Sequence, residues 1–155
     1  MRLSNLADYA IVLMSAAARH CGGVRASASS LAEETGVPGA TAHKLVHALV
    51  RAGLLKSVRG SGGGIKLARP AAAISVADII EAIEGPIALT ACVDHGRNEC
   101  VMEGSCRVQP HWAAINASMR GALGAINLAS LCSGAGRSAE DLALPSKAPA
   151  CAGAQ

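Results

Sequence analysis

The sequence contains no phenylalanine, and only one tryptophan and one tyrosine occur among its 155 residues. A core without large aromatic side chains must be built from leucine, isoleucine, valine and alanine, which indicates small, closely packed helices. The best apolar run, residues 9–18, is far shorter than the roughly 20 residues that a membrane-spanning helix needs. The first residues also lack the apolar segment of a signal peptide. These absences predict a cytoplasmic protein without a membrane partner, consisting of one domain with or without an appendage.

Acidic residues are missing from the whole stretch between Glu34 and Asp78, which contains six lysines and arginines. Residues 1–75 hold nine Lys or Arg against three Asp or Glu, whereas residues 76–155 hold five against eight. A basic block beside an acidic half indicates a polyanion partner at one face, although a solvated basic face gives the same charge pattern.

Periodic apolar residues predict four helices in the first half of the chain. Steps of three and four between apolar positions mark one buried face of each helix. A tight Val-Pro-Gly turn separates the second helix from the third. The four predicted helices cover residues 3–20, 27–35, 40–51 and 75–84.

Two short strands are predicted at residues 54–58 and 64–67, around a flexible, basic, glycine-rich loop. Helix, turn, helix and basic hairpin is the element order of a winged helix-turn-helix. We therefore predict a mainly α fold with a two-stranded wing over residues 1–84. The alternative is a small helical domain with an exposed basic helix.

Double-stranded DNA is the expected partner of this domain, because a helix fits the major groove and glycine amides of a wing can approach phosphates. The stretch without acidic residues covers both the third helix and the wing, which favours DNA binding over a helical domain with an exposed basic helix. The side chains expected to contact DNA are Thr41, His43, Lys44 and His47 on the third helix, and Arg59, Ser61 and Lys66 in the wing.

A long helix is predicted over residues 110–132, since Pro110 suits the first turn of a helix. Apolar residues in it step by three and four, which is a heptad-like pattern. The pattern favours a homodimer contact over packing on the chain's own domain. The residues expected at that contact are Trp112, Ile115, Met119 and Ile126. Residues 133–155 are rich in Ala, Gly, Pro and Ser and predict a disordered tail.

Three of the six cysteines, Cys92, Cys100 and Cys106, lie in residues 85–109, which show no periodicity. In a reducing cytoplasm such a group is more often a metal or redox site than a disulfide framework. The spacing contains neither the paired C-x-x-C units of structural zinc sites nor a C-x-x-C redox pair. An iron–sulfur cluster, a zinc site and thiol redox sensing all stay open on these grounds.

No nucleophile–base constellation and no cofactor loop is visible in the sequence, so we expect neither an enzyme nor a small-molecule substrate.

Several stretches resemble one family of regulators, the Rrf-type winged-helix iron–sulfur regulators, over roughly residues 1–132. The matching stretches are Arg2–Ala10, Arg51–Leu55, Val58–Pro70 and Ile74–Ile80. A narrower set is similar to the regulators of Suf cluster-assembly operons. That set comprises Glu84–Cys92, Glu103–Cys106, Pro110–Trp112 and Ile115-Asn116.

The resemblance implies a homodimeric repressor of iron–sulfur assembly genes, in which three cysteines per subunit hold a 2Fe–2S or 4Fe–4S cluster. Those cysteines are Cys92, Cys100 and Cys106. It also implies that Arg59 of the wing contacts DNA. Two candidates exist for a fourth ligand. Asp8 stands where NsrR-like members supply an acidic residue from the partner subunit, and it is preferred. His111 lies two residues beyond the IscR-like histidine position, which is Gln109 here.

Overall fold

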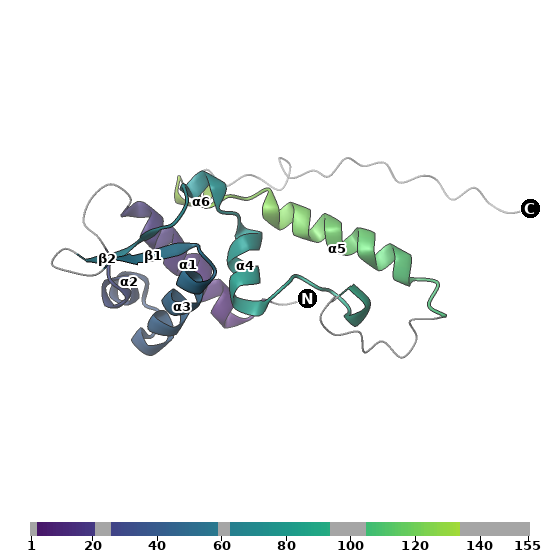
Figure 1. The fold of residues 1–155 in the computed structure, drawn as a ribbon, viewed down its shortest axis with the longest axis horizontal. Helices are drawn as coiled ribbons and strands as arrows, with labels where there is room; N and C mark the ends of the chain where they lie inside the picture. Colours follow the sequence, from purple (N-terminus) through teal and green to yellow (C-terminus); the bar gives the residue numbers. More distant parts are fainter. Residues whose placement is uncertain (1–2, 21–25, 59–62, 94–104, 134–155) are drawn as a thin grey trace, which may run out of the picture.

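A computed structural model describes residues 3–20, 26–58, 63–93 and 105–133 of the chain (Figure 1). The predicted mainly helical fold with one two-stranded antiparallel sheet is confirmed within these residues. No helix of this described part has the length and apolar character needed to cross a bilayer. In chain order the elements are α1 (Asn5–Arg19), α2 (Ala28–Thr35), α3 (Gly39–Arg51), β1 (Leu55–Val58), β2 (Gly64–Leu67), η1 (Ala71–Ala73), α4 (Val76–Glu84), η2 (Ala91–Val93), α5 (Gln109–Gly124) and α6 (Leu128–Cys132).

Local capping groups explain where the short helices begin and end. Ser27 and Ser30 form a reciprocal capping box at the start of α2, and Ser75 and Asp78 do the same for α4. Each box satisfies backbone amides that have no partner inside the helix. Gly36 ends α2 in the left-handed conformation (φ +73°), which costs glycine little because it has no Cβ. These signals are local, and the observed bounds agree with the predicted ones within one or two residues.

The core lies where α1, α2 and α3 meet, and β1, β2, α4 and α6 contribute to it. Alanines such as Ala10, Ala16 and Ala42 are fully buried, so the helix backbones approach closely, as the lack of aromatic residues predicts. Burying each large aliphatic side chain contributes about 1.5–3 kcal/mol. The largest fully buried side chains are Leu13, Met14, Leu31, Leu49, Leu54, Leu55, Ile74, Ile79, Ile80 and Leu128.

The wing is a hairpin with one face on the core, to which β1 contributes Leu55 and β2 contributes Ile65. β1 and β2 pair with Leu55 opposite Leu67 and Lys56 opposite Lys66. Leu55 is buried while both lysines are exposed, which is the period-two pattern of a strand with one covered face. The hairpin thus presents one charged surface to solvent beside α3.

The predicted continuous helix over residues 110–132 is wrong beyond Gly124. α5 ends there, and α6 begins only at Leu128. Between the two helices the chain returns to the N-terminal domain, where the Val76 backbone amide donates to the Ile126 carbonyl at 2.9 Å. Leu128 then inserts completely into the core. The helix ends because these residues gain tertiary partners that a continuous helix would deny them.

No residue of α5 is buried, and the helix extends away from the N-terminal domain (Figure 1). Its last turns are held at α4, where Leu123 packs on the small cluster of Ala7, Val76 and Ile80. α5 also packs against η2. α5 therefore joins the N-terminal domain to the segment that contains the cysteines.

Candidate nucleic-acid interface and cysteine site

The outer face of α3 carries the polar side chains that the sequence analysis assigned to DNA contact. His43, Lys44 and His47 are exposed, and Thr41 is half-buried. The opposite face is fixed in the core by four apolar side chains, so the helix cannot turn its polar face inward. Those core residues are Ala42, Leu45, Val46 and Leu49.

No carboxylate neutralises this face among the residues that the structure describes. Lys44 and Arg51 are exposed and form no ion pair there. Among the described residues, ion pairs join Arg19 and His20 to Glu34, Arg69 to Asp78, and Arg120 to Glu81. An uncompensated positive surface on an exposed helix attracts phosphate groups.

Two shallow hollows border α3, and His47 lines both of them. The first is lined by His43, Lys44, Ala48 and Arg51 in addition to His47. The second includes Ser57 of β1 and therefore connects α3 to the wing. His47 thus lies between the two elements that would meet DNA together.

Two lysines face each other across the wing. Lys56 and Lys66 are directly opposite in the antiparallel register, and both are exposed. Like charges at opposed positions destabilise a hairpin, and no described carboxylate pairs with either lysine. A phosphate would relieve this repulsion. Lys66 is among the residues predicted from the sequence to contact DNA, and Lys56 is not, although it is exposed on the neighbouring strand.

Two further wing residues assigned to DNA contact, Arg59 and Ser61, lie outside the described residues, as do Cys100 and nearly all of the predicted tail over residues 133–155.

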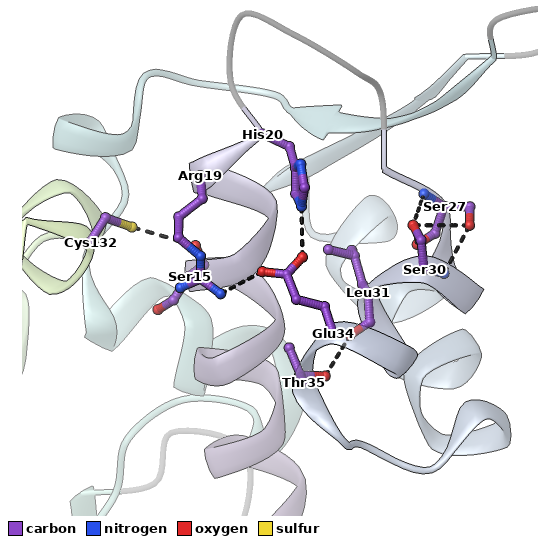
Figure 2. Close-up of polar contacts among 9 residues, drawn as sticks. All are labelled: Ser15, Arg19, His20, Ser27, Ser30, Leu31, Glu34, Thr35 and Cys132. Carbon is purple, nitrogen blue, oxygen red and sulfur yellow. Dashed lines mark hydrogen bonds and ion pairs between the residues drawn. The ribbon is translucent and has the colours of Figure 1, made fainter.

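The helix pair that presents α3 is tied together by polar contacts (Figure 2). Glu34 of α2 accepts hydrogen bonds from His20 Nε2 at 2.6 Å and Arg19 Nη2 at 2.7 Å, at the end of α1. The bonds from His20 and then Arg19 hold the pKa of Glu34 below its ordinary value of 4.5. On the other side, Ser29 Oγ lies 3.4 Å from His43 Nε2 and links α2 to α3.

Cys92 and Cys106 lie at the two ends of the segment that contains the third predicted cysteine. Both are free thiols and both are half-buried. Cys92 belongs to η2, which packs against α5, and its Sγ lies 3.1 Å from Thr90 Oγ1. Cys106 lies three residues before the start of α5, and the Gln109 backbone amide donates to the Cys106 carbonyl at 3.4 Å. Both cysteines therefore lie close to the same helix, α5.

These two thiols suit an iron–sulfur cluster or a soft metal ion. Neither is consumed by a disulfide, and half-buried thiols keep access for a ligand. Within the described residues, no group of three or more His, Cys, Asp and Glu side chains is assembled for a metal. Neither Asp8 in the first turn of α1 nor His111 in the first turn of α5 completes such a group there. Both are exposed.

The predicted dimer residues divide into two groups. Trp112, Ile115 and Met119 belong to α5, where Ile115 is 45% exposed and the other two are half-buried. Ile126 lies after the end of α5 and packs on the cluster around Val76 of its own chain. Ile126 is thus not part of α5, and its predicted role in a dimer contact stays a prediction.

Comparisons with known proteins agree with this geometry. A family model named Rrf2, described as an iron-dependent transcriptional regulator, matches residues 3–134. The transcriptional regulator NsrR of Oceanobacillus iheyensis is 31% identical over 70% of this chain and 74% of its own length.

Among solved structures, IscR of T. potens is 30% identical, with a TM-score of 0.67 over 87% of this chain and 88% of that one. CymR of B. subtilis, described as the global cysteine regulator, is 27% identical, with a TM-score of 0.68 over 86% of this chain and 97% of that one.

Proposed function

The chain belongs to the Rrf2 family of DNA-binding transcriptional regulators, which are not enzymes, and we propose that it senses through an iron–sulfur cluster and represses iron–sulfur assembly genes. The observation that carries the sensing part is the pair of free, half-buried thiols of Cys92 and Cys106 beside α5. The resemblance of Glu84–Cys92 to the regulators of Suf operons supports the choice of target genes.

For DNA binding, α3 enters the major groove and offers Thr41, His43, Lys44 and His47 to base edges and phosphates. The wing lies along the backbone beside it. Its contacts come from Arg59, Ser61 and Lys66. The uncompensated positive charge of both elements supports this placement.

Two copies of the chain bind one operator in this proposal, because helix-turn-helix proteins read two half-sites through a dimer. The exposed face of α5 with Trp112, Ile115 and Met119 is the proposed contact between the copies. Its support is that α5 buries none of its residues within one chain.

Cys92, Cys100 and Cys106 would hold the cluster as thiolates. Asp8 of the partner subunit is the preferred fourth ligand, and His111 is the alternative. A bound cluster supplies sensitivity to iron and to oxidants, since its assembly and integrity depend on both.

The proposed cluster ligands connect the state of the cluster to DNA affinity. If Asp8 of the partner subunit is the fourth ligand, the cysteine segment of one subunit is tied to α1 of the other. α1 packs directly on α3. Release of that tie would let the two α3 helices change their spacing, and both half-sites can be engaged together only at one spacing. A coupling free energy of about 1–3 kcal/mol is typical for such a switch.

A second candidate is a regulator without a cluster, in which the cysteines hold zinc or act as redox-sensitive thiols. The observation that favours it is the structural similarity to CymR, a cysteine regulator by its description. Both thiols being free suits this candidate equally.

The first experiment is anaerobic purification, followed by the ultraviolet–visible spectrum and counts of iron and acid-labile sulfide per subunit. We expect a brown protein that contains both elements and loses them in Cys92→Ala and Cys100→Ala. Cys132→Ala is the matched control, since Cys132 lies on α6 near the Ser15 carbonyl and should leave the spectrum unchanged. A colourless protein without iron after anaerobic reconstitution overturns the cluster and leaves the second candidate.

DNA binding is tested separately. A duplex selected from a random library serves as the probe, and its affinity is measured across salt concentrations. Lys44→Ala should weaken binding and reduce the salt dependence by about one phosphate contact. Arg107→Ala, an exposed cation beside Cys106, is the control that should bind normally. Equal behaviour of both variants contradicts the assignment of α3.

A further inference from the structure

The Asn116 side chain joins α5 to the backbone that leads to Cys92. Its Nδ2 group donates to the Ile87 carbonyl at 2.9 Å, and its Oδ1 accepts from the Leu89 amide at 3.0 Å. The carboxamide therefore pairs with one donor and one acceptor of the same short segment, as a neighbouring strand would. We call this pair of hydrogen bonds the Asn116 latch.

Asn116 is not placed in α5 to stabilise that helix. Asparagine is a poor residue for a helix interior, and alanine is better by several tenths of a kcal/mol. Asn116 is half-buried, and both of its polar groups bond to a distant segment. Leu89 is 27 residues away in the sequence and Ile87 is 29 residues away. The hydrogen bonds to Ile87 and Leu89 therefore explain why an asparagine occupies this position of α5.

Only two residues separate the latch from Cys92. After Leu89 the chain makes the η2 turn, which closes with the Val93 amide donating to the Thr90 carbonyl at 3.2 Å. Thr90 Oγ1 lies 3.1 Å from Cys92 Sγ in the same turn. A shift at Leu89 would therefore move the thiol of Cys92.

Cys106 is fixed to the same helix from its other side. Its carbonyl accepts from the Gln109 amide, which begins α5. Cys92 and Cys106 thus both take their positions from α5, Cys106 through the chain itself and Cys92 through Asn116. The two hydrogen bonds of Asn116 fix the position of the Ile87–Leu89 segment along α5, which apolar contact by itself would not do.

We infer that Asn116 is a positioning residue, whose carboxamide holds the segment Ile87–Leu89 so that the Cys92 thiol stays in register with Cys106. The cluster in this inference rests on the proposed function, whereas the two hydrogen bonds of Asn116 are present in the structure. Ligands of metal centres need such supporting contacts, and their loss typically lowers metal affinity about 10–100-fold.

The test compares Asn116→Ala and Asn116→Asp with Ser118→Ala, a control on α5 whose hydroxyl donates to the Ala114 carbonyl of the same helix. The first measurement is amide hydrogen exchange of residues 86–92 in the cluster-free protein. Asn116→Ala should speed exchange at Leu89 about tenfold, because its acceptor is gone. Asn116→Asp keeps that acceptor and loses the donor to Ile87, so its effect should be intermediate.

The second measurement is the rate at which the loaded protein loses its visible absorbance to an iron chelator. Asn116→Ala should lose the cluster about tenfold faster than the wild type, while Ser118→Ala loses it at the wild-type rate. The unfolding temperatures of the variants should differ little, which separates positioning from general destabilisation.

Unchanged exchange at Leu89 in Asn116→Ala overturns the latch. Faster exchange together with a wild-type rate of cluster loss overturns its role in positioning Cys92. A wild-type protein that takes up no cluster overturns the proposed function, and the exchange measurement then decides the latch by itself.

Discussion

Arg120 on α5 and Glu81 on α4 form a two-point ion pair, with Arg120 Nε 2.7 Å from Glu81 Oε1 and Nη2 2.9 Å from Oε2. The pair joins the long C-terminal helix to the DNA-binding part of the fold. The hydrogen bond from Arg120 and its positive charge hold the pKa of Glu81 below the ordinary value of 4.5.

This ion pair predicts a specific acid dependence of stability. Because the pKa of Glu81 is lowered on folding, its stabilisation is present above pH 4.5 and is lost as the pH falls through the lowered value. Glu81→Gln should therefore lower the unfolding temperature by at most a few degrees at pH 7, since exposed pairs contribute little. The difference from wild type should vanish in acid.

Thermal unfolding between pH 7 and pH 3 measures this effect, with Glu33→Gln as the control. Glu33 is exposed on α2, and no hydrogen bond or ion pair involves its side chain in the described part of the chain. Parallel stability curves for Glu81→Gln and wild type over the whole range would contradict the prediction.

The opposed lysines of the wing predict a conflict between stability and DNA binding. Lys66→Gln removes the repulsion with Lys56, so the free energy of unfolding at low salt should rise by a few tenths of a kcal/mol. The same change should weaken DNA binding and lower the salt dependence by about one contact. Urea unfolding and the duplex titration measure the two effects.

A double-mutant cycle provides the control for the wing. Lys56→Gln should stabilise the wild type more than it stabilises the Lys66→Gln variant, because the repulsion needs both lysines and is already absent in that variant. Additive effects of the two substitutions would show that the lysines do not interact.

Two glycines at the α2–α3 turn predict opposite responses to alanine. Gly36 has φ +73°, so Gly36→Ala should lower the free energy of unfolding by about 1 kcal/mol through backbone strain. Gly39 lies at the first position of α3 without a positive φ, so Gly39→Ala should raise it by about 0.4–1 kcal/mol. Apart from the adjoining residues and the helix backbone, no atom of the described part lies within 4 Å of either added Cβ, so urea unfolding isolates the backbone term. Changes of the same sign would refute this explanation.

The contact between Thr90 Oγ1 and Cys92 Sγ predicts an effect on redox potential if the proposed cluster is present. A hydroxyl that donates to a ligand sulfur stabilises the more negative, reduced cluster. Thr90→Val should therefore lower the reduction potential, and Thr90→Ser should restore it. Spectroelectrochemical titration measures the potential. Equal potentials in all three proteins would exclude the hydroxyl as a tuning group.

Most of the DNA-binding part could be predicted from local sequence. Serine caps, Gly36 and the three- and four-residue steps of α3 act within one or two turns, so they are readable without tertiary contacts. The exposed positions of His43, Lys44 and His47 follow from the same helical period. Lys56 could have been found in part, because strand alternation places it on the face opposite buried Leu55, whereas its position across from Lys66 depends on the hairpin register.

The cysteine site could be predicted only in part. The thiols themselves are visible in the sequence, but the groups that hold them are not. Asn116 finds its partners at Ile87 and Leu89, and no local pattern in α5 indicates that contact.

The sequence by itself thus determined the helices, the wing and the positive face, because period, caps and charge act over a few residues. Only the tertiary structure decided where the C-terminal helix ends and what positions Cys92. Ile126 looked like one more step of a helical pattern, yet its carbonyl pairs with the Val76 amide. Such pairings depend on which distant backbone groups become neighbours after the core has formed, and a local pattern contains no information about them.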